Sequence, residues 1–265
     1  MMLRIPFLNR HPVVSVLRLS GAIGTSGRMT LNDEALAPTI EKAFSKGKPK
    51  AVALLINSPG GSPVQSALIA SRIRRLADEK EIPVHAFVED VAASGGYWLA
   101  SAADDIWADE NSILGSIGVI SAGFGAHVFL ARQGVERRVH TAGKSKSTLD
   151  PFLPEKKEDV ERLTELLEGM HASFINQVKT RRGDRLSDET DLFTGEFWLG
   201  SRAVELGLAD GVAHAVPKLK ELYGDKVRLV PYTKKKGLLP KLGMNIAEDA
   251  LATIEERAAY ARFGL

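Results

Sequence analysis

The sequence predicts an α/β fold in which repeated ββα and βαβ units form a mostly parallel sheet, with helices in the C-terminal part. Short β-branched runs alternate with longer helical patterns, as in strands that are connected by right-handed crossovers. The run AVALLIN, residues 51–57, is apolar at every position but the last, which is typical of a central strand covered on both faces. A hydrophobic content of 44% is sufficient for a sizeable core.

The N-terminal elements follow from these patterns in order. A β-branched run predicts a strand over 13–21, and apolar residues at helical spacing predict helices over 31–47 and 62–80 on either side of the central strand. A strand over 83–89 comes next, and a helix is expected directly after Ser94. The remaining expected elements of this part are strands near 105–109 and over 118–122, a helix over 126–134 and a strand over 136–142.

The character of the sequence changes beyond Pro154. A long amphipathic helix is expected over 154–183, because its apolar residues recur on one side: Val160, Leu163, Leu166, Leu167, Met170 and Phe174. A turn with a short helix within 193–212 and a last strand over 226–232 complete this part. We expect one domain over residues 1–231, with a core at about 13–153 and a helical part at about 154–231.

The C-terminal residues 232–265 are expected to form a basic linker and a final amphipathic helix. The stretch TKKKGLLPKLG, residues 233–243, has linker composition, and Asn245 with Glu248 fits a capping box. The helix would place these residues on one stripe: Ile246, Ala250, Leu251, Ile254, Ala258 and Ala261. We expect it to dock on a neighbouring subunit or to lie near the substrate groove.

Composition narrows the class of function. A formal net charge of +2 gives no global sign of nucleic-acid binding, and the absence of cysteine excludes disulfides, thiolate catalysis and Cys-ligated zinc. Arginines interrupt the apolar N-terminus before it reaches the length of a signal peptide, and no stretch is long enough to span a membrane. We therefore expect a cytoplasmic protein without a transmembrane segment, and leave peripheral membrane association open.

Two glycine-rich turns follow predicted strands, NSPGG at 57–61 and ASGG at 93–96. Sites in open α/β sheets form at the carboxyl ends of strands, so both turns are expected at one edge of the sheet. Backbone N–H groups in such turns can bind an oxyanion, and Ser94 would stand at the positive end of a helix dipole. The alternative is purely structural, with glycine allowing close packing and Ser94 serving as an N-cap.

A serine nucleophile needs a base, and the sequence offers a histidine or a lysine. Of the six histidines, only His140 follows a predicted strand close to a candidate loop. The loop GKSK supplies Lys144 and Lys146, and burial can lower the pKa of a lysine by several units from about 10.4. A solvated basic loop is the alternative interpretation.

Five blocks of the sequence, in order, resemble those of the signal peptide peptidase A family of bacterial serine peptidases, a relative of the ClpP/crotonase superfamily. The blocks are NSPGG (57–61), ASGGYWLASAAD (93–104), ILGSIGVI (113–120), AGKSKSTLDPF (142–152) and TGEFWLGSRAVELGLADGV (194–212). The resemblance extends from about Val13 to Pro231 and implies a ClpP/crotonase-like fold.

The resemblance also implies a Ser/Lys catalytic dyad. Ser94 falls on the nucleophile position of the family and Lys146 on its general base, with Lys144 as a neighbour. Ser116 matches the serine that orients the lysine.

The oxyanion donors that the resemblance implies are the N–H groups of Gly61 and Gly95, with Gly60 shaping the turn. It implies no metal or cofactor. The expected protein is a serine endopeptidase that cleaves peptides such as signal-peptide remnants or unfolded segments, and forms closed homo-oligomers. Unlike many members, this chain shows no N-terminal anchor and holds one copy of each block. The alternatives are an acyl-CoA hydratase-like enzyme using Glu89 and Asp90, and a non-catalytic scaffold.

Overall fold

The computed structural model of the chain describes residues 11–25, 30–143, 145–233 and 257–265. Contacts within the chain define two compact units. Unit 1 consists of Met1–Ile117 and Ile175–Leu265, and unit 2 is Gly118–Phe174. Compact units defined by contacts do not say whether the chain folds as one domain, so the expected single domain over residues 1–231 stays a prediction.

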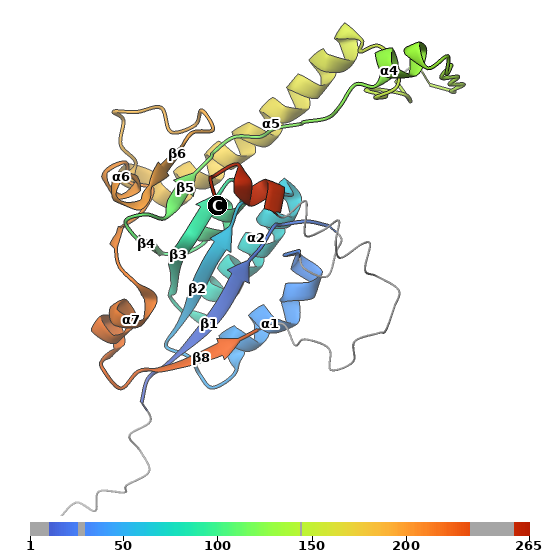
Figure 1. Ribbon diagram of the computed structural model, residues 1–265. Coiled ribbons are helices and arrows are strands. Elements are labelled where there is room, and N and C mark those ends of the chain that lie inside the picture. Colours follow the sequence, from blue (N-terminus) through green and yellow to red (C-terminus); the bar gives the residue numbers. More distant parts are fainter. Residues whose placement is uncertain (1–10, 26–29, 144, 234–256) are drawn as a thin grey trace, which may run out of the picture. The chain divides into compact units, whose positions relative to one another are not determined.

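Unit 1 is organised around one sheet with the strand order β6-β5-β3-β2-β1-β8, and β4 joins β3 to β7 beside this path (Figure 1). All strand pairs are parallel except β5 with β6. The predicted α/β fold with a mostly parallel sheet is therefore confirmed. The strands are β1 (Val13–Ser20), β2 (Ala51–Ser58), β3 (Val84–Ala93), β4 (Asp105–Ala108), β5 (Ile113–Gly115), β6 (Phe197–Leu199), β7 (Gly211–Val212) and β8 (Arg228–Tyr232).

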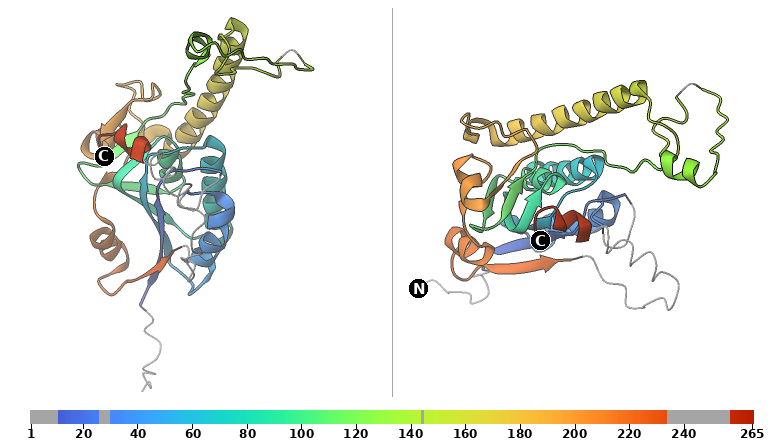
Figure 2. Two further views of the ribbon diagram at one scale, coloured as in Figure 1. Left: turned by 45° about the vertical axis from the view of Figure 1, so that its right-hand side comes forward. Right: turned by 45° about the horizontal axis from the view of Figure 1, so that its top comes forward.

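Helices cover both faces of this sheet (Figure 2, left). Helices α1 and α2 lie on one face, and α7 packs its Leu219 on the other, against Val14, Ala53 and Phe87. The helices are α1 (Asp33–Ser45), α2 (Pro63–Lys80), α3 (Gly95–Ala100), α4 (His127–Arg132), α5 (Lys157–Arg182), α6 (Gly200–Glu205) and α7 (Ala215–Tyr223), with a short 3-10 turn at Gly183–Arg185. No helix of the described residues is both long and apolar enough to cross a bilayer.

The last turn of α5 is fastened in unit 1 by a buried ion pair. The Arg182 guanidinium donates to both carboxylate oxygens of Asp210, at 2.6 and 3.1 Å, and to the Gly207 carbonyl at 2.8 Å. Burial by itself raises the pKa of Asp210, but Arg182, the Ile106 N–H and Arg185 outweigh it, so the pKa lies below its ordinary value.

Two predicted strands are wrong. Residues 118–122 and 136–142 have no strand partner among the described residues. Their β-branched content resembles that of a strand, but β propensity becomes a strand only where a neighbouring edge is available for pairing. The strand of this region is β5, which ends at Gly115, before the predicted one begins.

Unit 2 holds α4 and most of α5 and leaves much of its apolar surface exposed. None of the residues in α4 is buried, and the α5 side chains predicted as an apolar side are mostly open to solvent, Phe174 excepted. The large apolar residues of this unit that are exposed are Ile120, Phe124, Val128, Phe129, Val135, Val139, Phe152, Val160, Leu166 and Met170.

Candidate active site

The first glycine turn connects β2 to α2 at the carboxyl edge of the sheet. Ser62 is the N-cap of α2 and Pro63 its first residue, so the helix starts directly after the two glycines. The segment around Ile23 holds the turn in place, because the Ile23 N–H donates to the Gly60 carbonyl and the Ser62 N–H donates to the Ile23 carbonyl, each at 2.8 Å.

Both positions in this turn require glycine. Gly60 has φ +98° and Gly61 has φ +141°. A Cβ on Gly61 would lie 2.0 Å from the Ile23 carbonyl oxygen, and one on Gly60 would lie 2.7 Å from the Gly95 nitrogen. The first turn therefore packs directly against the turn that carries Ser94.

Ser94 stands between β3 and α3 in a strained backbone conformation, with φ +53° and ψ −122°. Its side chain makes no capping hydrogen bond to the helix, although the residue occupies the N-cap position. The structural alternative of an N-cap serine thus lacks the hydrogen bond that defines it. The hydroxyl is half-buried, at the N-terminus of a helix whose residues are all buried.

The N–H groups of Gly61 and Gly95 donate no hydrogen bond to any described residue. They belong to the two turns that contact each other where Gly60 meets Ser94 and Gly95. Unpaired backbone donors next to a serine hydroxyl are the arrangement that stabilises the oxyanion of acyl transfer.

A bulge in β3 sets the direction of the Ser94 turn. Val88 pairs with Ile56 and Ala92 with Ser58, so three residues of β3 oppose Asn57 alone. The bulge has no counterpart among the elements predicted from the sequence. The signal that could have revealed it is the pair of charged residues, 89 and 90, inside an apolar strand.

Ser116 lies beside Ser94. Ala93 and Gly115 are paired as the last residues of the parallel strands β3 and β5. Ser94 directly follows the first of these strands and Ser116 directly follows the second. The Ser94 N–H donates to the Gly115 carbonyl at 2.8 Å, and Ser116 also has a left-handed φ of +52°. Ser116 is held by the Glu196 carbonyl, which accepts from its N–H at 2.6 Å. Unit 1 thus brings together every predicted site residue except the lysine.

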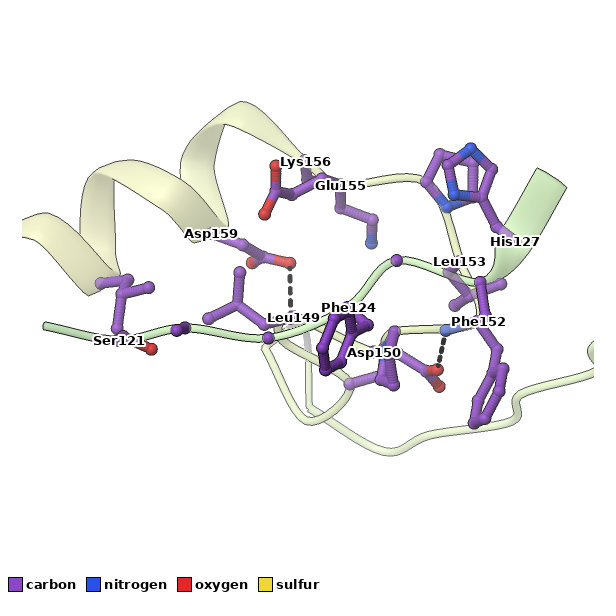
Figure 3. A pocket seen from close by; sticks show the side chains of 18 residues that line it. Ser121, Phe124, His127, Leu149, Asp150, Phe152, Leu153, Glu155, Lys156 and Asp159 are labelled. Atoms are coloured by element: carbon purple, nitrogen blue, oxygen red, sulfur yellow. Dashed lines mark hydrogen bonds between the residues drawn. The ribbon is translucent and has the colours of Figure 1, made fainter. Parts of the chain in front are cut away.

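Lys146 belongs to unit 2 and has an exposed side chain. Two hydrogen bonds formed by the segment after Lys146 are drawn in Figure 3 as dashed lines, one to α5 and one local to the segment. The Leu149 N–H donates to Asp159 at 3.4 Å, and the Phe152 N–H donates to Asp150 at 2.9 Å. The Phe152 N–H, and then Arg137, keep the pKa of Asp150 below its usual value. The alternative base, Lys144, lies outside the described residues.

A pocket of about 730 Å³ adjoins this loop in unit 2 (Figure 3). Residues 121–127, the segment after Lys146 and the start of α5 line it, and Phe124 and Leu149 contribute apolar surface. The pocket gives the lysine loop an apolar neighbourhood within its own unit.

The C-terminal residues 257–265 lie against the carboxyl edge of unit 1, near the ends of the central strands (Figures 1 and 2, red). The Tyr260 hydroxyl donates to the Asn57 carbonyl at 2.7 Å, and Phe263 packs edge-on to Phe197 with ring centroids 5.2 Å apart. Asn57 directly precedes Ser58 at the start of the first glycine turn. Phe197 directly follows Glu196, whose carbonyl accepts the hydrogen bond from the Ser116 N–H. The prediction that the tail lies near the groove stays open for residues 234–256, which are not described.

A serine in a strained turn, with backbone N–H groups in the adjoining turn, can act as a nucleophile with an oxyanion site. Among the described residues, no group of three or more His, Asp or Glu side chains is arranged to hold a metal ion. His140 is exposed and belongs to unit 2.

Comparison with known proteins relates the chain to a family of peptidases. The family model described as "Peptidase family S49" matches residues 77–224, which include Ser94, Ser116 and Lys146. "Probable protease SohB" of Haemophilus influenzae is 32% identical over 242 residues, covering 91% of this chain and 67% of that protein. "Serine protease SPPA, chloroplastic" of Arabidopsis thaliana is 30% identical, covering 89% of this chain and 36% of that protein.

Two longer relatives carry a different name. Proteins called "Na(+)/H(+) antiporter NhaA" from Brucella melitensis and Brucella abortus are each 50% identical to this chain over 271 residues. The match covers 95% of this chain but 37% of each antiporter-named protein, so the larger part of those proteins lies outside it.

Proposed function

This chain belongs to peptidase family S49, as a relative of signal peptide peptidase A, and from that membership we propose a serine endopeptidase with a Ser94/Lys146 dyad. The Ser94 hydroxyl attacks the scissile carbonyl, and neutral Lys146 takes its proton. The oxyanion is held by the N–H groups of Gly61 and Gly95. Lys146 then protonates the leaving amine and activates the water that hydrolyses the acyl-enzyme.

The observation that carries this proposal is the pair of unpaired N–H groups beside a strained serine whose hydroxyl does not cap its helix. Backbone strain of this kind persists where the surrounding structure enforces it, typically at functional sites. Ser116 directly follows β5, the strand that pairs with β3, and its hydroxyl is the group that would orient the lysine.

The base requires a partner surface. Lys146 is exposed in the single chain, whereas a lysine becomes neutral near pH 7 when it is desolvated. We therefore propose that the chain forms a closed homo-oligomer in which neighbours cover the lysine loops. The exposed apolar residues of unit 2 and the open Val64 and Leu68 of α2 supply apolar surface for such contacts.

We propose cytoplasmic peptides as the substrates, such as signal-peptide remnants or unfolded segments, with small or apolar side chains beside the cleaved bond. The hydratase-like alternative loses support from the side chains it needs. The Glu89 carboxylate is occupied by the Arg18 guanidinium and Asp90 by the Asn57 amide. Both carboxylates therefore already have partners, which leaves neither of them available for acid–base chemistry at an acyl-CoA.

A partner is suggested by the two Brucella relatives, in which a segment 50% identical to this chain is part of a protein named as a Na(+)/H(+) antiporter. We propose that this peptidase acts beside such an antiporter. When an affinity-tagged peptidase is purified from solubilised membranes, the antiporter should be recovered with it. If no more antiporter is recovered than with an untagged peptidase, the association is contradicted.

A fluorophosphonate probe tests the proposed function directly, because it reacts with an activated serine hydroxyl. Labelling should occur at Ser94, disappear in Ser94→Ala and persist in Ser45→Ala, whose hydroxyl lies in the exposed last turn of α1. Peptide hydrolysis should follow the same pattern. Labelling of another serine, or undiminished hydrolysis by Ser94→Ala, would place the nucleophile elsewhere.

A further inference from the structure

Five exposed cations gather at the edge of unit 1 where the parallel strands begin, opposite to the edge that carries Ser94. We refer to this set as the basic edge: Lys48, Lys50, Lys80, Lys226 and Arg228. Lys48, Lys50 and Lys80 line one hollow of about 520 Å³ between the ends of α1 and α2. Lys226 and Arg228 stand at the start of β8.

Backbone hydrogen bonds place the two halves of the basic edge side by side. The Lys50 N–H donates to the Val13 carbonyl, and the Arg228 N–H donates to the Pro12 carbonyl, each at 2.8 Å. Lys50 and Arg228 therefore flank the start of β1 on its two sides, one strand spacing of about 4.8 Å away on each. Lys48 and Lys50 precede β2, Lys80 ends the helix that leads to β3, and Lys226 and Arg228 stand at the start of β8.

These cations are not neutralised within the described part of the chain. None of the five has an ion-pair partner there, whereas other lysines do, such as Lys157 with Glu161 and Lys218 with Glu221. Glu81 and Asp225 are the exposed carboxylates beside the basic edge.

The remaining carboxylates near these strand starts are already paired. Asp104 accepts from Arg74 and Arg181, and Asp105 accepts from His85. Lysines at helix C-termini do complement the helix dipole, but Lys226 and Arg228 stand at a strand, so the dipole does not account for them.

The chain that precedes this edge has a composition suited to lipid. β1 begins at Val13, between Lys50 and Arg228, and residues 1–10 precede this strand in the sequence. They contain apolar residues and two arginines: Met1, Met2, Leu3, Ile5, Phe7 and Leu8, with Arg4 and Arg10. Apolar side chains next to clustered cations favour contact with an anionic bilayer surface.

We propose that the basic edge docks unit 1 on an anionic phospholipid bilayer, with the Ser94 edge directed away from the lipid. An anionic surface attracts the exposed cations of the basic edge. The inference goes beyond the peptidase function and does not depend on it.

Vesicle binding tests the proposal without reference to catalysis. The full chain should cosediment with vesicles of phosphatidylglycerol and phosphatidylcholine, but not with phosphatidylcholine alone, and rising salt should release it because exposed charges are screened. Lys48→Glu with Lys50→Glu should lower the partition coefficient by about 30-fold, which corresponds to about 1 kcal/mol for each lysine. Lys48→Arg with Lys50→Arg should bind like the wild type.

A matched control reverses two exposed cations of unit 1 outside the basic edge, Lys179→Glu with Arg202→Glu. This variant should retain vesicle binding, and all variants should hydrolyse a soluble peptide at the wild-type rate. Equal loss in both charge-reversal variants, equal binding to neutral vesicles, or binding to DNA in preference to vesicles would overturn the proposal. If peptide hydrolysis is absent while vesicle binding follows the expected pattern, only the proposed catalytic function fails.

Discussion

The Ser94 edge and the Lys146 loop contribute to the same proposed reaction but differ in what surrounds them. Ser94 stands between buried elements, in a turn whose glycines have no space for a side chain. Lys146 is exposed, on a loop fixed by hydrogen bonds of exposed or half-buried groups. The fold of one chain therefore holds the proposed nucleophile and the proposed oxyanion donors, whereas the desolvation that a lysine base needs has to come from something that covers the loop.

The largest expected effect comes from the lysine. Lys146→Ala should lower kcat/KM by more than about 1,000-fold, as removal of a catalytic base does. Lys146→Arg should be equally inactive, because a guanidinium keeps its proton and cannot act as a base. Stopped assays on a peptide substrate measure both.

Lys144→Ala is the matched control for this variant and should retain most activity. If Lys144→Ala loses as much as Lys146→Ala, or more, the base has been assigned to the wrong lysine. Activity in Lys146→Arg would mean that the side chain contributes only its charge.

The second effect tests whether neighbouring chains complete the site. Ser94→Ala and Lys146→Ala should each be inactive, but an equal mixture, dissociated and reassembled, should recover about a quarter of wild-type activity. That fraction follows if each site takes its serine and its lysine from different protomers of a closed ring, assembled at random. Sedimentation should show an oligomer of unchanged size. A strict monomer with full wild-type activity would remove the need for neighbours.

Sequence patterns predicted the Ser94 edge better than they predicted the residues between β5 and α5. The NSPGG block fixes its own conformation, because Gly60 and Gly61 have a positive φ that favours glycine. In the ASGG block glycine is needed for space, since a Cβ on Gly96 would lie 2.3 Å from the Ser58 carbonyl oxygen. Residues 118–122 and 136–142 have strand-like composition, but whether they pair depends on which edges are available, and a single sequence does not contain that information.

Some contacts at the Ser94 edge could not be predicted for a related reason. Glu196 and Ser116 are 80 positions apart and meet only because β6 pairs with β5 in the antiparallel sense. Tyr260 reaches Asn57 across 203 positions, through a side chain that has no motif around it. Contacts of this separation are set by topology, and local periodicity does not report them.

The third effect concerns the stability of unit 1, the unit that carries Ser94. Asp210→Asn should lower the free energy of unfolding by about 3 kcal/mol, since it leaves the buried Arg182 guanidinium without its charge partner. Denaturant unfolding measures this change. Asp184→Asn, which changes an exposed carboxylate two residues after Arg182, should leave the free energy of unfolding unchanged.

The same ion pair predicts a dependence on pH. The pKa of Asp210 is depressed in the folded state, so its contribution is fully present above the unfolded pKa of about 3.9 and is lost as the pH falls through the folded value. The stability difference between wild type and Asp210→Asn should therefore narrow only below about pH 4. A difference that stays constant into strong acid would exclude the charge as its origin.

The fourth effect concerns Ser116, which stands on the Ser94 side and is expected to act on the lysine. Ser116→Ala should lower kcat by about 10-fold with little change in KM, the loss of one hydrogen bond to a charged or reacting group. Ser116→Gly keeps the left-handed backbone and also removes the hydroxyl, so it should lose activity equally. Full activity in Ser116→Gly would show that the backbone conformation, and not the hydroxyl, is what matters.

The smallest effect belongs to the C-terminal segment, which lies on the Ser94 edge and therefore tests how open that edge is. Truncation after Tyr232 should raise kcat/KM for a peptide by about 5-fold, because the Tyr260 hydrogen bond and the Phe263 contact together hold the segment by about 1 kcal/mol net.

Tyr260→Phe should reproduce part of the gain, and Tyr232→Phe, whose hydroxyl bonds to the Lys46 carbonyl instead, should have none. The segment contacts Asn57 and Phe197, and a fluorophosphonate is much smaller than a peptide, so labelling of Ser94 should proceed in both the full and the truncated chain. The small probe would thus reach Ser94 in the presence of the C-terminal segment, whereas a longer peptide has to displace that segment to bind. Unchanged peptide hydrolysis and unchanged oligomer size after truncation would mean that the segment rests on the edge without restricting it.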